Sequence, residues 1–134
     1  MEKNPTLVVA AALVDAAGRV LLQQRSPGRS MAGLWEFPGG KVENGELPEA
    51  ALIRELKEEL GIETDRACLA PAAFASHPLG DGHMLLLLYV CRKWRGTPEP
   101  LDSSGLKWVR PVEMFALDMP PADTPLIGLL DALI

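Results

Sequence analysis

The chain has 134 residues, of which 48% are hydrophobic and 23% are charged, and its formal net charge at pH 7 is −5. This length and composition are typical of one globular domain, so we assign residues 1–134 to a single domain. The acidic balance disfavours a polymeric nucleic acid as the partner, because such proteins usually carry a basic patch. The apolar runs at 7–14 and 84–90 are too short for a membrane-spanning helix, which needs about 20 residues.

The two cysteines, Cys68 and Cys91, lie inside apolar runs and lack the spacing of a metal-binding pair. Buried, reduced thiols are therefore favoured over a disulfide or a metal site. Reduced thiols fit a reducing compartment, and we expect the protein to be cytoplasmic.

The first half of the chain contains three predicted strands. Residues 6–14 and 19–25 are apolar runs joined by the sequence DAAG, which predicts a hairpin of strands buried on both faces. Residues 26–33, SPGRSMAG, have turn chemistry and are predicted to form an exposed loop, a common place for ligand binding. Residues 34–40 are predicted to be a short strand ending in a tight turn, where two glycines allow close approach to a ligand.

A helix follows, with Pro48 in its first turn and Gly61 at its C-terminal cap. Two more strands are predicted at 68–76 and 83–94, a short one at 106–109, and a helical turn at 111–115. The last helix is predicted to start with Thr124 as its cap and Pro125 in its first turn. This order of elements predicts an α/β (α+β) fold in which a mixed sheet lies between helices.

The central helix carries Glu55, Glu58 and Glu59 on one face, and Leu52, Leu56 and Leu60 on the neighbouring face. Like charges at these spacings repel one another, and they lie in the C-terminal half of the helix, where the dipole disfavours them. A solvated acidic face is one interpretation. The other is a bound Mg²⁺ ion, which prefers hard oxygen ligands.

The order of residues around these acids matches every fixed position of the Nudix box: Gly40, Glu46, Arg54-Glu55-Leu56, Glu58-Glu59 and Gly61-Ile62. The chain therefore resembles the Nudix hydrolases. That resemblance implies an α/β/α sandwich and hydrolysis of a nucleoside diphosphate linked to another group, with Mg²⁺ or Mn²⁺ as cofactor. It makes Glu55, Glu58, Glu59 and the backbone carbonyl of Gly39 the metal ligands. It also implies that Glu46 and Arg54 brace the glycine loop, including Gly40, against the helix.

The resemblance extends to the segments VVAAA, LQQR, GLWEFPGGK and PPADTPL, which are similar to MutT-type diphosphatases. These enzymes hydrolyse 8-oxo-dGTP to the monophosphate and pyrophosphate, which removes an oxidised precursor before it enters DNA. A close branch prefers CTP and 5-methylated cytidine nucleotides. A nucleotide-binding module without turnover is a third hypothesis, which the intact set of three acids disfavours. Monomer and homodimer both stay open.

The resemblance also suggests a fourth metal-site acid. Asp102 precedes Trp108 by six residues, where the group usually carries a Glu that completes the metal and water site. Asp102 could instead simply close the turn DSSG, and Glu99 is then the substitute. We expect Glu55 to act as the base that takes the proton of the attacking water.

Four residues are candidates for substrate binding. Arg25 is predicted to face phosphate, with an exposed arginine at the strand end as the alternative. Phe37 is predicted to form a wall or stacking surface for the base, and Glu36 to project from the other side of the same strand. Asp123 lies where MutT itself has Asn. An ionised Asp only accepts hydrogen bonds, from cytosine N4 or guanine N1 and N2, whereas a protonated one also donates. Asp123 could also be an ordinary residue before a helix.

The other aromatic rings and the histidines are given structural roles. Trp35 and Trp94 are expected to pack in the protein rather than stack on a base. His77 and His83 flank a turn without ligand spacing and are expected at strand ends.

Overall fold

The computed structural model describes residues 4–134. Seven strands, two α-helices and two short 3₁₀ helices follow one another in these residues. The elements are β1 (Thr6–Leu13), β2 (Val20–Gln24), β3 (Trp35–Glu36), β4 (Gly39–Lys41), α1 (Pro48–Leu60), η1 (Arg66–Cys68), β5 (Leu69–Leu79), β6 (Gly82–Cys91), β7 (Gly105–Val109), η2 (Pro111–Ala116) and α2 (Thr124–Leu133). In this described part of the chain, no helix is long and apolar enough to cross a membrane.

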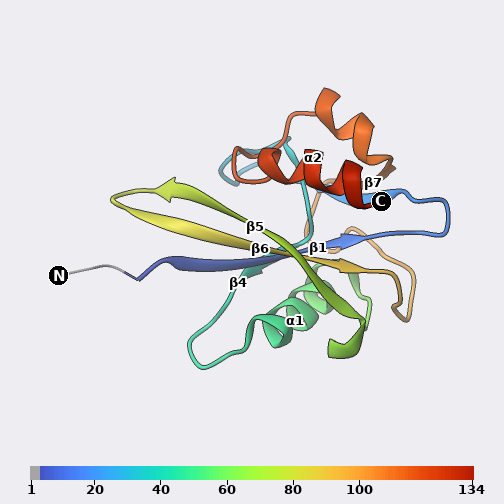
Figure 1. The fold of residues 1–134 in the computed structure, drawn as a ribbon, viewed down its shortest axis with the longest axis horizontal. Helices are drawn as coiled ribbons and strands as arrows, with labels where there is room; N and C mark the ends of the chain where they lie inside the picture. Colours follow the sequence, from blue (N-terminus) through green and yellow to red (C-terminus); the bar gives the residue numbers. More distant parts are fainter. Residues whose placement is uncertain (1–3) are drawn as a thin grey trace.

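The strands form two sheets. The larger one has the order β4-β1-β6-β5, with β1 parallel to β6 and the other pairs antiparallel. The smaller one has the order β3-β2-β7 and is antiparallel. Helix α1 lies on one side of the larger sheet and helix α2 on the other (Figure 1). The predicted mixed sheet between helices is therefore confirmed.

Strands β1 and β2 do not form the predicted hairpin. Their turn is present, since the Asp15 backbone N–H donates to the Arg19 carbonyl at 2.9 Å and Val14 bridges Val20. Beyond that bridge the two strands separate, because β4 and β6 occupy both edges of β1 while β2 pairs with β3 and β7. The prediction was right for the turn and wrong for the pairing.

The strand predicted at residues 34–40 is divided for the same reason. Its first part, β3, pairs with β2, whereas its second part, β4, pairs with β1. The chain passes from one sheet to the other at Phe37 and Pro38. The predicted tight turn at Gly39 and Gly40 is wrong, because both glycines belong to β4 and pair with Ala10 and Val9 of β1. This glycine segment lies where the two sheets separate.

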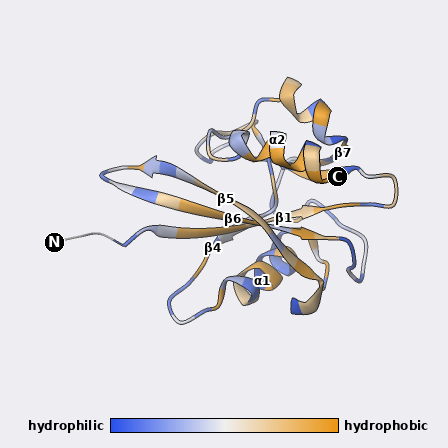
Figure 2. Ribbon diagram, in the orientation of Figure 1, coloured by the Kyte–Doolittle hydropathy of each residue, from blue (hydrophilic) through white to orange (hydrophobic). Residues whose placement is uncertain are grey.

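The alternating residues of β1 face two different cores. Val9, Ala11 and Leu13 belong to a cluster with the buried leucines of α1. Ala10 and Ala12 belong to a second cluster that includes Leu126, Ile127 and Leu130 of α2. The predicted burial of this strand on both faces is confirmed, and Figure 2 shows the same apolar central strands and the strongly apolar helix α2.

The boundaries of α1 were predicted correctly. The helix begins at Pro48, and Gly61 ends it with φ of 71° and a hydrogen bond from its N–H to the Lys57 carbonyl at 3.0 Å. In α2 the cap position is Asp123, not Thr124, and Pro125 lies in the first turn. The Thr124 hydroxyl instead donates to the Pro120 carbonyl at 3.4 Å.

The later strands differ from the prediction at their ends. Strand β5 continues to Leu79, and β6 ends at Cys91, before Trp94. The ring of Trp94 stacks on Trp108 with the centroids 6.2 Å apart, as expected of a packing residue. Both cysteines are free thiols, with Cys91 buried and Cys68 partly exposed.

Candidate active site

A cavity of about 630 Å³ lies where the two sheets separate, a size that suits a nucleotide. Its lining includes most of the predicted site residues: Arg25, Glu36, Phe37, Gly39, Gly40, Glu55, Glu59, Asp102 and Asp123. The structure therefore brings together groups from strand β4, helix α1 and the segment before α2. The lining does not include Glu46, Arg54, Glu58 or Glu99.

Gly40 of β4 lets the Glu55 carboxyl group lie directly against the backbone. A Cβ atom at Gly40 would lie 2.5 to 2.8 Å from the carboxyl atoms of Glu55, closer than real side chains allow. At Gly39, with φ of 155°, a Cβ would overlap the backbone carbonyl of Val9. Gly39 therefore needs glycine, whereas a side chain at Gly40 would displace the carboxyl group of Glu55, which is the flexible end of its side chain.

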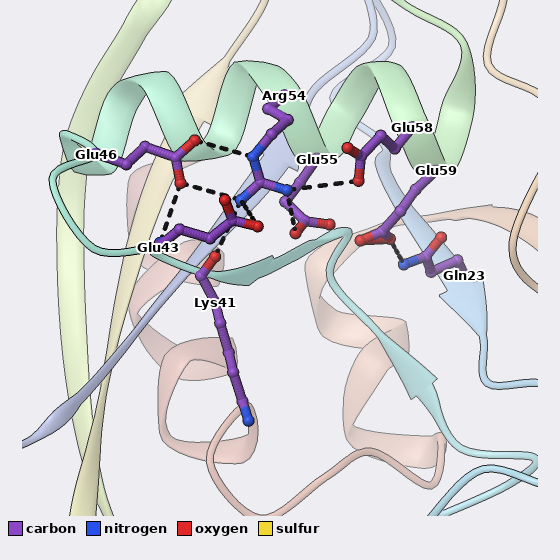
Figure 3. A network of polar contacts seen from close by, with 8 residues as sticks. All are labelled: Gln23, Lys41, Glu43, Glu46, Arg54, Glu55, Glu58 and Glu59. Atoms are coloured by element: carbon purple, nitrogen blue, oxygen red, sulfur yellow. Dashed lines mark hydrogen bonds and ion pairs between the residues drawn. The ribbon is translucent and has the colours of Figure 1, made fainter.

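Arg54 connects the loop before helix α1 to the acids of the helix (Figure 3). Its Nε and one terminal nitrogen donate to the two Glu46 oxygens at 2.9 and 3.0 Å. The other terminal nitrogen donates to Glu55 at 3.0 Å, and a further hydrogen bond reaches the Lys41 carbonyl at 3.2 Å. The hydrogen bonds from Arg54 lower the pKa of Glu46. The arginine thus holds loop and helix together while orienting Glu55.

Glu59 is buried, with 6% of its surface exposed, and receives a hydrogen bond from the side-chain amide of Gln23 on β2. Burial, together with the neighbouring Glu55, raises the pKa of Glu59 to about 9, while the hydrogen bond from Gln23 opposes the shift. Figure 3 shows the carboxyl groups of Glu55 and Glu59 on the same side of α1. Two adjacent carboxyl groups, of which one is buried, are a favourable place for a cation.

The other two predicted ligands are engaged elsewhere. Glu58 is 60% exposed and lies 3.4 Å from Arg54, and Asp102 forms an ion pair with Arg29 at 2.7 Å. Within residues 4–134 no group of three or more potential ligands is already gathered around one point. The all-oxygen donor set of Glu55 and Glu59 still fits Mg²⁺ or Mn²⁺, which bind few protein ligands and complete their shell with water and phosphate.

Arg25 does not present a free guanidinium to the cavity. It donates to Glu36 at 2.7 Å and to the Ser30 carbonyl at 2.8 Å. Burial raises the pKa of Glu36, and the hydrogen bond from Arg25 opposes that shift. The pair lies in the cavity wall close to Asp123, since the charges of both residues act on the pKa of Asp123.

Asp123 lies at the end of the cavity formed by the segment before α2, with only 7% of its surface exposed. Burial, with a smaller contribution from the negative charge of Glu36, raises its pKa to about 7. A hydrogen bond with the Phe37 backbone and the charge of Arg25 act in the opposite direction. This carboxyl group therefore changes protonation state near neutral pH.

The apolar lining near Asp123 is formed by core residues. Phe37 is 4% exposed and belongs to the α2-side core, so it forms a wall of the cavity. Leu86, Met84 and Ala122 extend this wall. One end of the cavity is therefore apolar apart from the Asp123 carboxyl group.

Two residues of the site were not anticipated. Gln23 is a polar residue inside the otherwise buried strand VLLQQ, a signal that could have identified it. Arg29 lies in the predicted exposed loop, and nothing near it in sequence points to its partner Asp102. Glu99 is exposed, and its backbone N–H donates to the Leu60 carbonyl at 3.0 Å.

The remaining aromatic and histidine assignments agree with the structure. Trp35 packs against the α2-side core and lies beneath the Lys107 ammonium, 5.3 Å from the ring centroid. His77 and His83 lie near the turn of the β5–β6 hairpin.

Comparison with known proteins places this site in a family. The NUDIX domain profile matches residues 4–130. The chain is 38% identical over 127 residues to the CTP pyrophosphohydrolase of Escherichia coli K12, covering 93% of this chain and 91% of that one. It is 36% identical over 114 residues to the 8-oxo-dGTP diphosphatase of the same organism, covering 85% and 87%.

The solved structures agree. The E. coli ORF135 protein superimposes with a TM-score of 0.86 at 36% identity, covering 97% of this chain and 91% of that one. A structure from the work on MutT of Aliivibrio salmonicida and Vibrio cholerae gives a TM-score of 0.79 at 26% identity, covering 98% of this chain and 100% of that one. The chain therefore belongs to the Nudix family, within the branch of 8-oxo-dGTP diphosphatases and CTP pyrophosphohydrolases, and is a nucleoside triphosphate pyrophosphohydrolase.

Proposed function

We propose that this enzyme hydrolyses 8-oxo-dGTP to 8-oxo-dGMP and pyrophosphate, and so removes an oxidised precursor from the cytoplasmic nucleotide pool. The observation that carries this proposal is the buried Asp123 carboxyl group in the cavity wall, with a pKa of about 7. In its protonated form it both donates and accepts hydrogen bonds, as an amide does. It can then donate to O6 of 8-oxoguanine and accept from the N7 hydrogen that unmodified guanine lacks.

Hydrolysis of CTP or 5-methyl-dCTP is the second candidate. It is favoured by the 38% identity to a protein named CTP pyrophosphohydrolase and by the ionised form of the same residue. Ionised Asp123 accepts hydrogen bonds and could take one from the cytosine N4 amine. The two candidates therefore assign opposite protonation states to one side chain.

The chemical step uses the acids of helix α1. Glu55, Glu58, Glu59 and the Gly39 carbonyl would hold Mg²⁺ or Mn²⁺, with Asp102 as a further ligand. Bound metal supplies charge neutralisation on the phosphates and a lower pKa for the attacking water. Glu55, which receives a hydrogen bond from Arg54 and lies against Gly40, accepts the proton of that water. Arg25 helps to place the phosphates once they approach the Arg25–Glu36 pair.

The test is pyrophosphate release with Mg²⁺, comparing kcat/KM for 8-oxo-dGTP, dGTP, CTP and 5-methyl-dCTP. A large preference for 8-oxo-dGTP over dGTP supports the proposal, and a preference for the cytidine nucleotides replaces it with the second candidate. Selectivity for 8-oxo-dGTP should be greater below pH 7 than above it, because Asp123 loses its proton as the pH rises through its pKa.

A matched pair of variants separates turnover from simple binding. Glu55→Gln should fold normally and lose at least about 100-fold in kcat, whereas Glu43→Gln, at an exposed acid of the neighbouring loop, should stay active. Full activity in Glu55→Gln would contradict the mechanism. If no nucleotide is hydrolysed by the unmodified protein, the non-catalytic binding module is the correct description.

A further inference from the structure

The two long loops at the mouth of the cavity are joined by one ion pair. Arg29, in the segment between β2 and β3, donates to both carboxylate oxygens of Asp102 at 2.7 and 2.9 Å. Asp102 lies in the segment between β6 and β7, and both residues line the cavity. The pair thus lies at the site that phosphates and metal would enter.

The pair itself contributes little to stability. The two side chains are 53% and 49% exposed, and ion pairs as exposed as this one are weak because water competes for both partners. The loop does not depend on it, since Arg25 already anchors the loop through the Ser30 carbonyl at 2.8 Å. A contact of this kind can exchange partners at low cost.

Arg29 is better placed than Arg25 to receive a phosphate. Arg25 is paired with Glu36 in the cavity wall, and the side chains of that pair are only 25% and 22% exposed. Only one terminal nitrogen of Arg29 contacts Asp102, and a guanidinium can place two nitrogens on a phosphate. A triphosphate carries more negative charge than a single carboxylate, so it should displace Asp102 from Arg29.

Asp102 then gains a free carboxylate in the same cavity as Glu55 and Glu59. While it is paired with Arg29, its charge is neutralised and both of its oxygens accept hydrogen bonds. Loss of that partner makes it available to a cation. The arrival of phosphate and the completion of the metal site are therefore linked through one arginine.

We propose that Arg29 is a substrate-binding residue that couples these two events: in the free enzyme it holds Asp102, and on binding of a triphosphate it transfers to the phosphate and releases Asp102 to the metal. This inference rests on the proposed hydrolysis of nucleoside triphosphates, but it does not depend on which base is preferred.

The experiment measures Mn²⁺ affinity of the full-length protein without nucleotide, by electron paramagnetic resonance, and then the inhibition constant of inorganic triphosphate in the presence of metal. Arg29→Gln should tighten Mn²⁺ binding about two- to fivefold, because it frees Asp102 from a weak ion pair. The same variant should weaken triphosphate binding about tenfold. In an Asp102→Asn background, Arg29→Gln should no longer change Mn²⁺ affinity.

Arg19→Gln is the matched control. Arg19 is also exposed and ion-paired with an aspartate, Asp15, at 2.8 Å, but neither residue lines the cavity. Arg19→Gln should change neither the Mn²⁺ affinity nor the inhibition constant of triphosphate.

Unchanged or weaker Mn²⁺ binding in Arg29→Gln overturns the proposal, as does the same tightening in the Asp102→Asn background. Unchanged triphosphate binding overturns it as well. Because Mn²⁺ and inorganic triphosphate contain no base, these results are separate from the substrate comparison that tests the proposed 8-oxo-dGTP activity.

Discussion

The side-chain amide of Gln23 donates a hydrogen bond to the carboxyl group of Glu59, 36 positions later in the chain. This contact joins the three-stranded sheet to helix α1, and both residues are nearly completely buried, with 3% and 6% of their surfaces exposed. The other amide atom of Gln23, Oε1, has no hydrogen-bond partner within the described part of the chain. The contact therefore orients Glu59 but leaves one of the two hydrogen-bonding groups of the Gln23 amide without a partner.

Gln23→Leu should weaken Mn²⁺ binding about tenfold while the protein stays folded. Residues that hold a metal ligand in place typically contribute about 10- to 100-fold to metal affinity. A leucine also removes the unpaired amide oxygen, which limits the loss of stability. Mn²⁺ titration and thermal unfolding measure the two effects. Gln24→Leu is the control, because the Gln24 amide donates to the Gly33 carbonyl instead, and equal losses in both variants would contradict the role of Gln23.

Gly40→Ala should reduce kcat/KM at least about 100-fold. The added Cβ would lie 2.5 Å from the carboxyl carbon of Glu55, so the carboxyl group that is proposed as the base must move. Stability should change little, because the displaced atoms are the end of a flexible side chain and not part of a packed core. Gly105→Ala is the control, since a Cβ there meets nothing within 4 Å. Kinetics at saturating metal would test this prediction, and near-normal activity would show that Glu55 does not need its present position.

Arg54→Lys should lower both stability and kcat, the first by about 1–2 kcal/mol and the second by about tenfold. Lysine cannot reproduce the planar fork that contacts both Glu46 oxygens while another nitrogen contacts Glu55. Arg66→Lys is the control, because Arg66 is 68% exposed and lies 3.5 Å from Glu49. Denaturant unfolding and steady-state kinetics distinguish the outcomes. A loss of stability with unchanged kcat would make Arg54 a purely structural residue.

Asp123→Asn should change how stability depends on pH. The pKa of Asp123 is about 7 in the folded protein, against an ordinary value of 3.8 for the unfolded chain. Between about pH 4 and pH 7 the folded state therefore holds a proton that the unfolded state has lost. The stabilisation from the protonated carboxyl group is present in full below about pH 4. It disappears as the pH rises to about 7, which corresponds to about 2–4 kcal/mol.

The asparagine variant lacks this loss, so its stability relative to the unmodified protein should increase over the same pH range. Chemical denaturation at several pH values measures the difference. The charged neighbours Glu36 and Arg25 are present in both proteins, so their own effects on stability largely cancel in the difference between the two. Asp131→Asn, at an exposed position of α2, is the control. A difference that stays constant with pH would contradict a buried, protonated Asp123.

The features that depend on residues close in sequence could be predicted. Pro48 and Gly61 mark the two ends of α1, and the spacing of Leu52, Leu56 and Leu60 sets its buried face. The positions of Glu55 and Glu59 on the helix follow from the same periodicity. The spacing of the box residues indicates the family for the same reason, because the whole box lies within one loop and one helix.

The features that depend on distant pairing could not be predicted. Strands β1 and β2 separate because each finds other partners, and those partners come from 39–41, 82–91 and 105–109. The partner of Arg29 lies 73 positions away, so its role is invisible in the sequence of its loop. The protonation of Asp123 depends on burial by several elements, which no local pattern records.

Strand β1 separates the protein into two hydrophobic layers that have no buried residue in common. The layer with α1 supports the acids proposed to carry out hydrolysis, whereas the layer with α2 contains Phe37 and Ala122 beside Asp123, the residue proposed to contact the base. Substitutions in separate layers should combine additively, since they share few contacts. A lineage can therefore change the base it recognises by altering one layer while the hydrolytic layer stays intact. Such independence explains how enzymes with different preferred nucleotides can retain one catalytic helix.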